Sequence, residues 1–202
     1  MNEPRNRKSK AWKLIRRAAA VCLIALALTA GVICSYCAII QFLGNVHVVV
    51  EHQFYRSAEL NKTALQRVIR EDGIKSILNL QGFSPDKSWY ADEIAASQEL
   101  GVAHYDYGIS ARSVVTPDRI DEILNIIRDA PKPMLVHCKA GADRTGLISA
   151  IYLAKIRGVM VDQAASQLSL YYGHFPWLGS RTAAMDQSFE GYIKQAENLH
   201  YR

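Results

Sequence analysis

Residues 18 to 50 of this 202-residue chain contain no aspartate, glutamate, lysine or arginine. A helix that crosses a bilayer needs about 20 apolar residues, and residues 18–40 supply them. The alternative is a cleaved signal peptide, whose apolar stretch usually runs to about 7–15 residues and ends in a small-x-small site. The longer stretch here, without such a site at its end, predicts an uncleaved N-terminal transmembrane anchor at 18–40.

Excess positive charge is absent beyond residue 17. Residues 1–17 contain seven Lys/Arg and one Glu, a net charge of +6, and the whole chain carries +5. The remainder is therefore close to neutral, at −1, which argues against a nucleic-acid-binding face on the folded part. Because the basic flank precedes the anchor, the positive-inside tendency predicts a cytoplasmic tail at 1–17 and a periplasmic or extracytoplasmic domain at 45–202.

Cysteine is scarce outside the anchor. Cys22, Cys34 and Cys37 lie in the apolar stretch, where cysteine commonly acts as a small hydrophobic residue, and Cys138 is alone in the rest of the chain. A single thiol cannot form an internal disulfide, so Cys138 is a candidate nucleophile.

Apolar periodicity and turn residues predict an alternation of strands and helices after the anchor. We expect strands at 45–50, 74–82, 102–109 and 133–138, and helices at 61–73, 88–101, 116–130, 145–158, 161–173 and 181–199. This order predicts an α/β fold with a mostly parallel central sheet flanked by helices, preceded by one transmembrane helix. Ligands of such sheets bind at the carboxyl ends of strands, where Cys138 is expected.

The segment VHCKAGADRTG, residues 136–146, combines a strand end, a glycine-containing loop and a helix start. Free N–H groups and the helix dipole make such a turn an anion site, and Gly141 lets the loop curl so that successive amides point inward. The guanidinium of Arg144 matches two phosphoryl oxygens. The predicted phosphate-binding residues are Lys139, Ala140, Gly141, Ala142, Asp143, Arg144 and Thr145.

The chemistry expected of this loop is nucleophilic attack on phosphorus. Thiols in positive surroundings ionise at neutral pH, and a thiolate can form a covalent cysteinyl-phosphate that water later hydrolyses. The Thr145 hydroxyl can assist the thiolate and the second step, and His137 is expected to orient the loop through hydrogen bonds.

HCKAGADRTG resembles the H-C-x5-R-[S/T] signature of the protein tyrosine phosphatase superfamily, in its dual-specificity-like branch. FYRSAEL (54–60), GIKSILNLQG (73–82) and LYYGHFP (170–176) look like the accompanying segments of bacterial members, so the resemblance covers about residues 46–195. It implies a small α/β phosphatase domain that needs no metal or other cofactor. By the same resemblance Cys138 is the nucleophile and Arg144 the phosphate clamp.

The chain departs from the family pattern at the general acid. The aspartate expected on the loop after the preceding strand is replaced, in YGISARSVVTPD, by Ser113. Asp106 lies in the predicted strand, where a structural role is expected, and Asp118 in a helix's first turn, which favours acidic residues. Asp143 is the preferred candidate, because a carboxylate beside a bound phosphate retains a proton more readily.

The sequence thus predicts a membrane-anchored phosphomonoester hydrolase. Its partners would be the membrane and a phosphorylated substrate, either a phosphotyrosine protein or a lipid or envelope phosphate, with Lys139 adding charge at the mouth of the site. A pseudophosphatase that binds phosphate without turnover is the alternative raised by the missing loop aspartate. A rhodanese-type sulfurtransferase also places cysteine at a helix N-terminus, although the sequence around Cys138 fits a phosphatase better.

Overall fold

The computed structural model describes residues 3–200, and the chain divides into two units, residues 1–39 and 40–202. Helix α1, Glu3–Phe42, contains the predicted anchor and extends it at its N-terminal end. The extension has a simple cause, since the Lys and Arg residues of the tail are good helix formers. Within the described part of the chain, the segment Trp12–Phe42 of α1 is the one stretch long and apolar enough to cross a membrane.

The second unit is built on a five-stranded sheet in the order β1-β2-β5-β3-β4. Strands β2 (Phe54–Ser57), β5 (Met134–His137), β3 (Ser76–Asn79) and β4 (Ala103–Asp106) are parallel, and the edge strand β1 (His47–Val50) is antiparallel to β2. This confirms the predicted mostly parallel sheet. Strand β2 is not predicted from the sequence. All four of its residues are buried, so the strand shows no alternation of exposed and buried positions.

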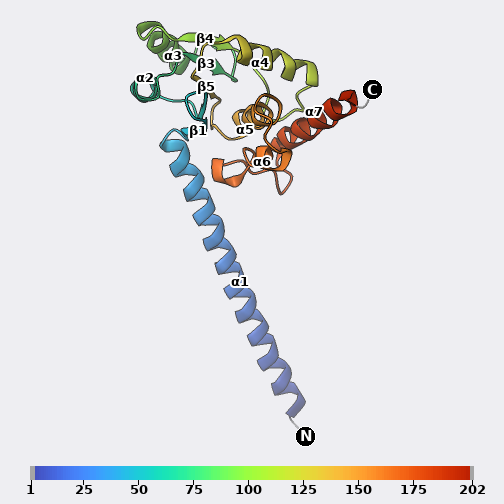
Figure 1. The fold of residues 1–202 in the computed structure, drawn as a ribbon. Coiled ribbons are helices and arrows are strands. Elements are labelled where there is room, and N and C mark those ends of the chain that lie inside the picture. The colour runs from blue at the N-terminus through green and yellow to red at the C-terminus, as the bar shows by residue number, and fades with distance from the viewer. Residues whose placement is uncertain (1–2, 201–202) are drawn as a thin grey trace. The chain divides into compact units, whose positions relative to one another are not determined.

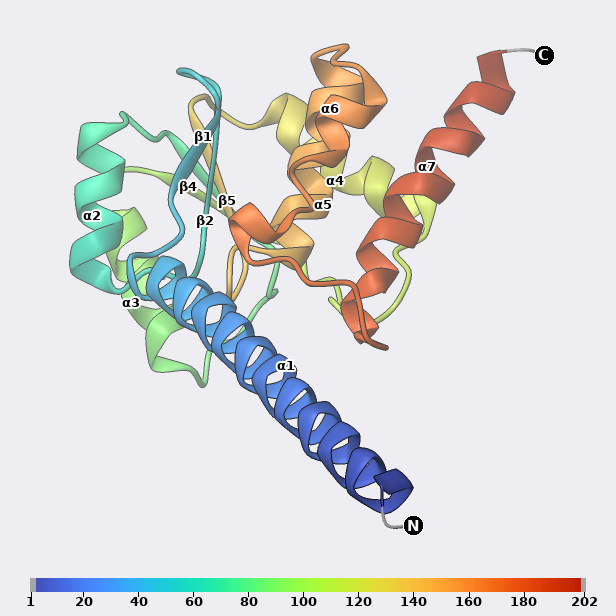
Figure 2. The ribbon, with the colours of Figure 1, turned by 90° about the horizontal axis from the view of Figure 1, so that it is seen from below.

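Helices cover both faces of the sheet (Figures 1 and 2). Helices α2 (Lys62–Glu71) and α3 (Ser88–Glu99) cover one face, and α4 (Pro117–Asp129), α5 (Asp143–Ile151) and α7 (Ala184–His200) the other. Alternate strand residues divide between two apolar clusters. Tyr55, Ile77 and Leu135 pack with the first pair of helices, and Phe54, Leu78 and Val136 with the second group.

The structure corrects three predicted helices after the loop. The helix expected at 145–158 begins at Asp143 and continues after Ile151 as a π-helical turn, Tyr152–Ile156. The segment 161–173 contains only the short α6, Val161–Ala165, and a 3-10 turn at Leu170–Tyr172. Between them the Gln167 carbonyl accepts a hydrogen bond from an arginine side chain. The last helix starts at Ala184, after a 3-10 turn at Arg181–Ala183.

Candidate active site

The turn from β5 into α5 forms the candidate site. β5 is the middle strand of the sheet, and residues 138–142 connect its carboxyl end to the first residue of α5, Asp143. Cys138, the first residue of the turn, is 2% exposed, and Lys139 next to it is exposed. All the predicted phosphate-binding residues, 139–145, therefore lie in one loop and the first turn of its helix.

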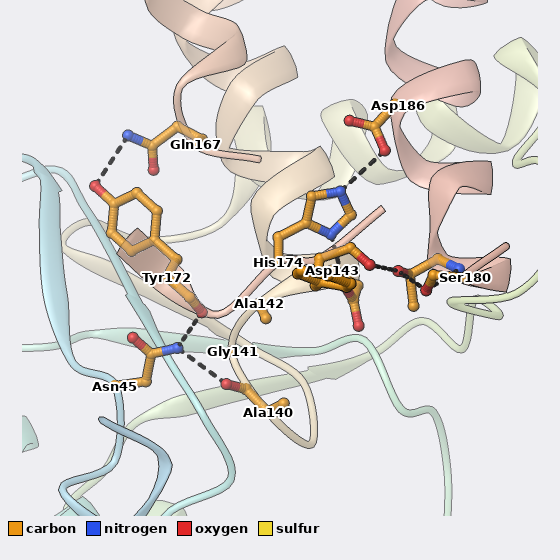
Figure 3. A network of polar contacts seen from close by, with 12 residues as sticks. Asn45, Ala140, Gly141, Ala142, Asp143, Gln167, Tyr172, His174, Ser180 and Asp186 are labelled. Carbon is orange, nitrogen blue, oxygen red and sulfur yellow. Dashed lines mark hydrogen bonds and ion pairs between the residues drawn. The ribbon is translucent and has the colours of Figure 1, made fainter. Parts of the chain in front are cut away.

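The carbonyl groups of this loop are held from outside. The carbonyl oxygens of residues 139–142 all accept hydrogen bonds from other segments. The Lys139 oxygen accepts from the Glu59 amide at 3.3 Å, and the Ala140 oxygen from Nδ2 of Asn45 at 3.0 Å (Figure 3). The oxygens of Gly141 and Ala142 both accept from Nη2 of Arg56, at 2.8 and 3.4 Å. In a trans peptide the carbonyl and the next N–H point in opposite directions. Among the residues that the structure describes, the N–H groups of 140–143, which follow these four carbonyls, have no backbone acceptor. The loop therefore presents unpaired amides on the side away from its braces.

Gly141 is required by this arrangement. Its φ of +67° lies in the left-handed region. A Cβ at this position would also lie 2.6 Å from the Ala58 nitrogen and 2.7 Å from the Ser57 oxygen. The loop thus passes directly against the end of β2, where backbone alone fits.

Arg144 is held over the loop by the neighbouring strands. Its Nη1 donates to the carbonyl oxygens of Leu80, 3.2 Å away, and Ile109, 3.4 Å away, which follow β3 and β4. Its Nε is buried and has no partner within residues 3–200. The Thr145 hydroxyl is also buried without a partner there. Both groups therefore retain hydrogen-bonding capacity next to the unpaired amides.

The buried carboxylate of Glu93 contacts His137, the residue that precedes Cys138. Glu93 of α3 is 3% exposed; its Oε1 accepts from Nε2 of His104 at 2.7 Å, and its Oε2 lies 2.9 Å from Nε2 of His137. The second contact is an ion pair without hydrogen-bond geometry. Burial by itself raises the pKa of the Glu93 carboxyl, but the two histidines outweigh it and hold that pKa at about 2. His137 is thus tied to α3 on the far side of the sheet from α5.

Asp143 has a specific partner that the sequence does not reveal. His174 is fully buried, and its Nδ1 donates to Asp143 Oδ1 at 2.7 Å and its Nε2 to Asp186 Oδ2 at 2.9 Å (Figure 3). Burial lowers the pKa of His174, but the hydrogen bonds to the two aspartates outweigh this and raise it. His174 therefore favours the imidazolium form and links the loop to α7.

We expect these two networks to make stability fall at both ends of the pH range. A raised folded-state pKa means that His174 stabilises the fold fully below pH 6.5 and loses this contribution as the pH rises through the raised value. The depressed pKa of Glu93 acts oppositely, and its contribution is lost as the pH falls from 4.5 towards 2. Thermal unfolding followed by circular dichroism across this range measures both.

A matched pair of variants separates the alkaline effect. His174→Gln should remove the decrease in melting temperature above pH 6.5, whereas His52→Gln, at an exposed histidine, should leave it in place. An alkaline decrease that persists in His174→Gln would show that another group is responsible.

The other acid candidates lie in different settings. Asp106, at the end of β4, accepts from Nδ2 of Asn79 at 2.8 Å and from the Tyr90 hydroxyl, the contacts of a structural carboxylate. Asp118 is exposed in the first turn of α4. Ser113, where the family pattern places aspartate, is exposed on the loop between β4 and α4. Asp143 is the one of these residues that directly follows the loop, as the first residue of α5.

Sequence reasoning missed the residues that brace the loop. Asn45 and Arg56 bond its carbonyls and Gln167 in turn bonds Arg56, and all three are buried polar residues far from the loop in the chain. One signal was available: the charged Arg56 directly follows two aromatic residues, Phe54 and Tyr55, and a charge that becomes buried requires partners.

The fold and this loop define a dual-specificity-type cysteine phosphatase. Residues 52–157 match the family model described as polymorphic toxin system, DSP-PTPase phosphatase, and because this match spans more than half of the chain, the protein belongs to that family. The match leaves the sulfurtransferase alternative without support.

Solved structures agree on the fold. P. aeruginosa TpbA is 21% identical with a TM-score of 0.58, over 76% of this chain and 91% of that one. The core catalytic domain of the PP-IP phosphatase SIW14 from S. cerevisiae is 18% identical with a TM-score of 0.57, over 78% and 93%. PTPMT1 is 14% identical with a TM-score of 0.53, over 76% and 99%. No curated protein sequence matches the chain.

Proposed function

We propose that this phosphatase is a membrane-anchored phosphomonoester hydrolase that acts through a cysteinyl-phosphate intermediate. The observation that carries the proposal is the loop 139–142, whose carbonyls are all bonded outward and whose following amides, 140–143, have no backbone acceptor. A row of unpaired amides at a helix N-terminus is suited to a phosphoryl group. Nε of Arg144, also unpaired, adds a charged donor.

In this mechanism the Cys138 thiolate attacks the phosphorus of the bound monoester. A sulfur–phosphorus bond forms while the bond to the leaving oxygen breaks, and that oxygen takes a proton from an acid. Water then attacks phosphorus and passes a proton back to the carboxylate of that acid; the sulfur–phosphorus bond breaks, inorganic phosphate is released and the thiolate is restored. The unpaired Thr145 hydroxyl is suited to stabilise the departing thiolate.

Asp143 is the proposed proton donor. It lies in the first turn of α5, and its side chain is 21% exposed. Its contact with His174 orients one carboxylate oxygen away from solvent and leaves the other available.

We expect Asp143→Asn to lower kcat more for alkyl phosphates than for aryl phosphates. General acid catalysis contributes typically about 10²–10⁴-fold, and an aryl leaving group needs less protonation. Steady-state kinetics on a matched alkyl and aryl pair measures the difference. Asp186→Asn is the control, because it removes the other aspartate of His174 and leaves the loop carboxylate in place. Equal losses on both substrates would mean that Asp143 only shapes the loop.

Substrate choice is tested by incubating the full-length protein, in detergent and with chelator present, with each candidate substrate and measuring the phosphate released. TpbA has been captured with pTyr and SIW14 is a PP-IP phosphatase, so both a phosphotyrosine peptide and inositol phosphates belong in the panel. The panel also contains p-nitrophenyl phosphate, phosphatidylglycerophosphate and phosphoinositides, since an anchor would bring the domain to lipid headgroups. Preference for a lipid would identify a lipid phosphatase, and preference for the peptide a protein phosphatase.

The anchor and its orientation form a separate part of the proposal. The apolar part of α1 is preceded by the basic tail 1–17, which supports a cytoplasmic N-terminus and an extracytoplasmic domain. We expect alkaline phosphatase fused after residue 202 to be active in cells, because that reporter folds only when exported. A matched fusion to a chain in which the seven basic residues of the tail are replaced by glutamine should lose part of this activity. An inactive fusion to the unaltered chain would contradict the proposed topology and indicate that the domain after α1 is cytoplasmic.

A further inference from the structure

Arg56 is the most deeply buried charged residue at the loop, and the mechanism above does not use it. It lies in β2 and is 0% exposed. Its partner in the neighbouring strand β5 is Val136, which comes two residues before Cys138. A Cβ on Gly146 would lie 3.5 Å from Arg56 Nη2, so the guanidinium also reaches the first turn of α5. It therefore lies behind the phosphate loop, on the side of the braced carbonyls.

The guanidinium makes contacts that use its fork shape. Nη2 donates to the oxygens of Gly141 and Ala142, and Nη1 to the backbone oxygen of Gln167 at 2.9 Å and its Oε1 at 2.7 Å. Cζ lies 3.7 Å from the ring centroid of Tyr172. A planar group with several donors can hold two segments at once, which a lysine ammonium cannot do with the same geometry.

No carboxylate balances this charge. Within residues 3–200, no acidic side chain lies at ion-pair distance from Arg56, and its Nε is buried without a partner. The acids packed around the loop are engaged elsewhere: Glu93 with His104 and His137, and Asp143 and Asp186 with His174. Buried charges are normally paired, so an unpaired guanidinium here calls for another anion.

We propose that Arg56 is a positioning residue with an electrostatic role, a permanent positive charge behind the phosphate loop that stabilises the Cys138 thiolate and the bound phosphoryl group. The inference rests on the proposed function, since it takes Cys138 as the nucleophile. Burial lowers the pKa of Arg56 to about 10, against the opposing effects of Tyr172 and Cys138, so the guanidinium is charged at neutral pH.

The test is the pH dependence of Cys138 alkylation by iodoacetamide in the full-length protein in detergent. Mass spectrometry of the Cys138 peptide separates this thiol from the three in α1. Arg56→Met removes both the charge and the brace, and Arg56→Gln removes the charge but keeps a donor for the loop. Because a nearby opposite charge favours ionisation by about 1–3 pK units, both variants should raise the alkylation midpoint by that amount.

Asn45→Ala is the matched control, because it removes the brace on the Ala140 carbonyl without changing charge. Its midpoint should stay close to that of the unaltered chain, and Arg56→Lys should also stay close. Neutral Arg56 variants that fold by circular dichroism and alkylate as Asn45→Ala does would show that Arg56 is only a brace. Arg56→Lys keeps the charge but loses the fork, so a raised midpoint in that variant would also overturn the inference.

The alkylation measurement does not depend on turnover. Failure of the proposed function would appear as phosphate release that survives Cys138→Ser, whatever the alkylation profiles show. Failure of the Arg56 inference would appear as an unmoved midpoint in an enzyme that still requires Cys138.

Discussion

Replacing Cys138 with serine is expected to abolish phosphate release and to leave phosphate binding in place. Loss of the nucleophile of a covalent hydrolase costs roughly 10⁶-fold in kcat, because the hydroxyl is not ionised and cannot form the intermediate. The amides of 140–143 and the Arg144 side chain are unchanged by this substitution, so the anion site persists. Serine is close in size, and the fold should be retained.

The measurement pairs turnover of p-nitrophenyl phosphate with vanadate or phosphate binding by calorimetry. Cys34→Ser is the matched control, since it makes the same chemical change in α1 and should keep full activity. Retained turnover in Cys138→Ser would remove the nucleophile assignment. An unaltered chain that binds phosphate without releasing it from any substrate would favour the pseudophosphatase, and Ser113→Asp would then be the first change to make.

Arg144→Lys is expected to lower kcat/KM by roughly 10²–10³-fold, the usual cost of losing one preorganised donor to a developing negative charge. The guanidinium is positioned by the Leu80 and Ile109 carbonyls, and its Nε is left for the substrate. A lysine retains the charge but cannot satisfy the two carbonyls and a phosphoryl group in the same geometry. Phosphate binding should weaken together with turnover.

Arg119→Lys provides the control for this variant. Arg119 is exposed and donates from Nη2 to the Gly108 carbonyl at 2.6 Å, on the same loop that Arg144 contacts through Ile109. A loss confined to Arg144→Lys assigns the effect to the phosphate site. Equal losses in the two variants would instead mean that the loop after β4 needs its guanidinium contacts and that Arg144 has no separate role.

The geometry also bears on how this enzyme manages without aspartate at Ser113. Ser113 is exposed, whereas Asp143 is fixed against His174 and through it against Asp186. A side chain held by a buried partner on a helix start is better ordered than one on a surface loop. The proposed acid thus directly follows the proposed phosphate-binding loop, and its position depends on the segment that contains His174.

The sequence by itself determined the long apolar N-terminal helix, the alternation that leads to a mostly parallel sheet, and the loop 138–142 at a strand's carboxyl end. These follow from local patterns: an uncharged apolar stretch, apolar periodicity, and a cysteine, glycine and arginine within a few residues. Such features depend on neighbouring residues, so they can be read along the chain.

Only the tertiary structure decided what surrounds that loop. Asn45 and Arg56 reach it from positions 95 and 85 residues away from the carbonyls they bond, and His174 reaches Asp143 from 31 residues away. The identity of a polar residue and its neighbours in the sequence do not predict which distant residue it will contact once it is buried. Strand register and the packing of α5 and α7 bring these partners together, and burial then makes each of their hydrogen bonds necessary.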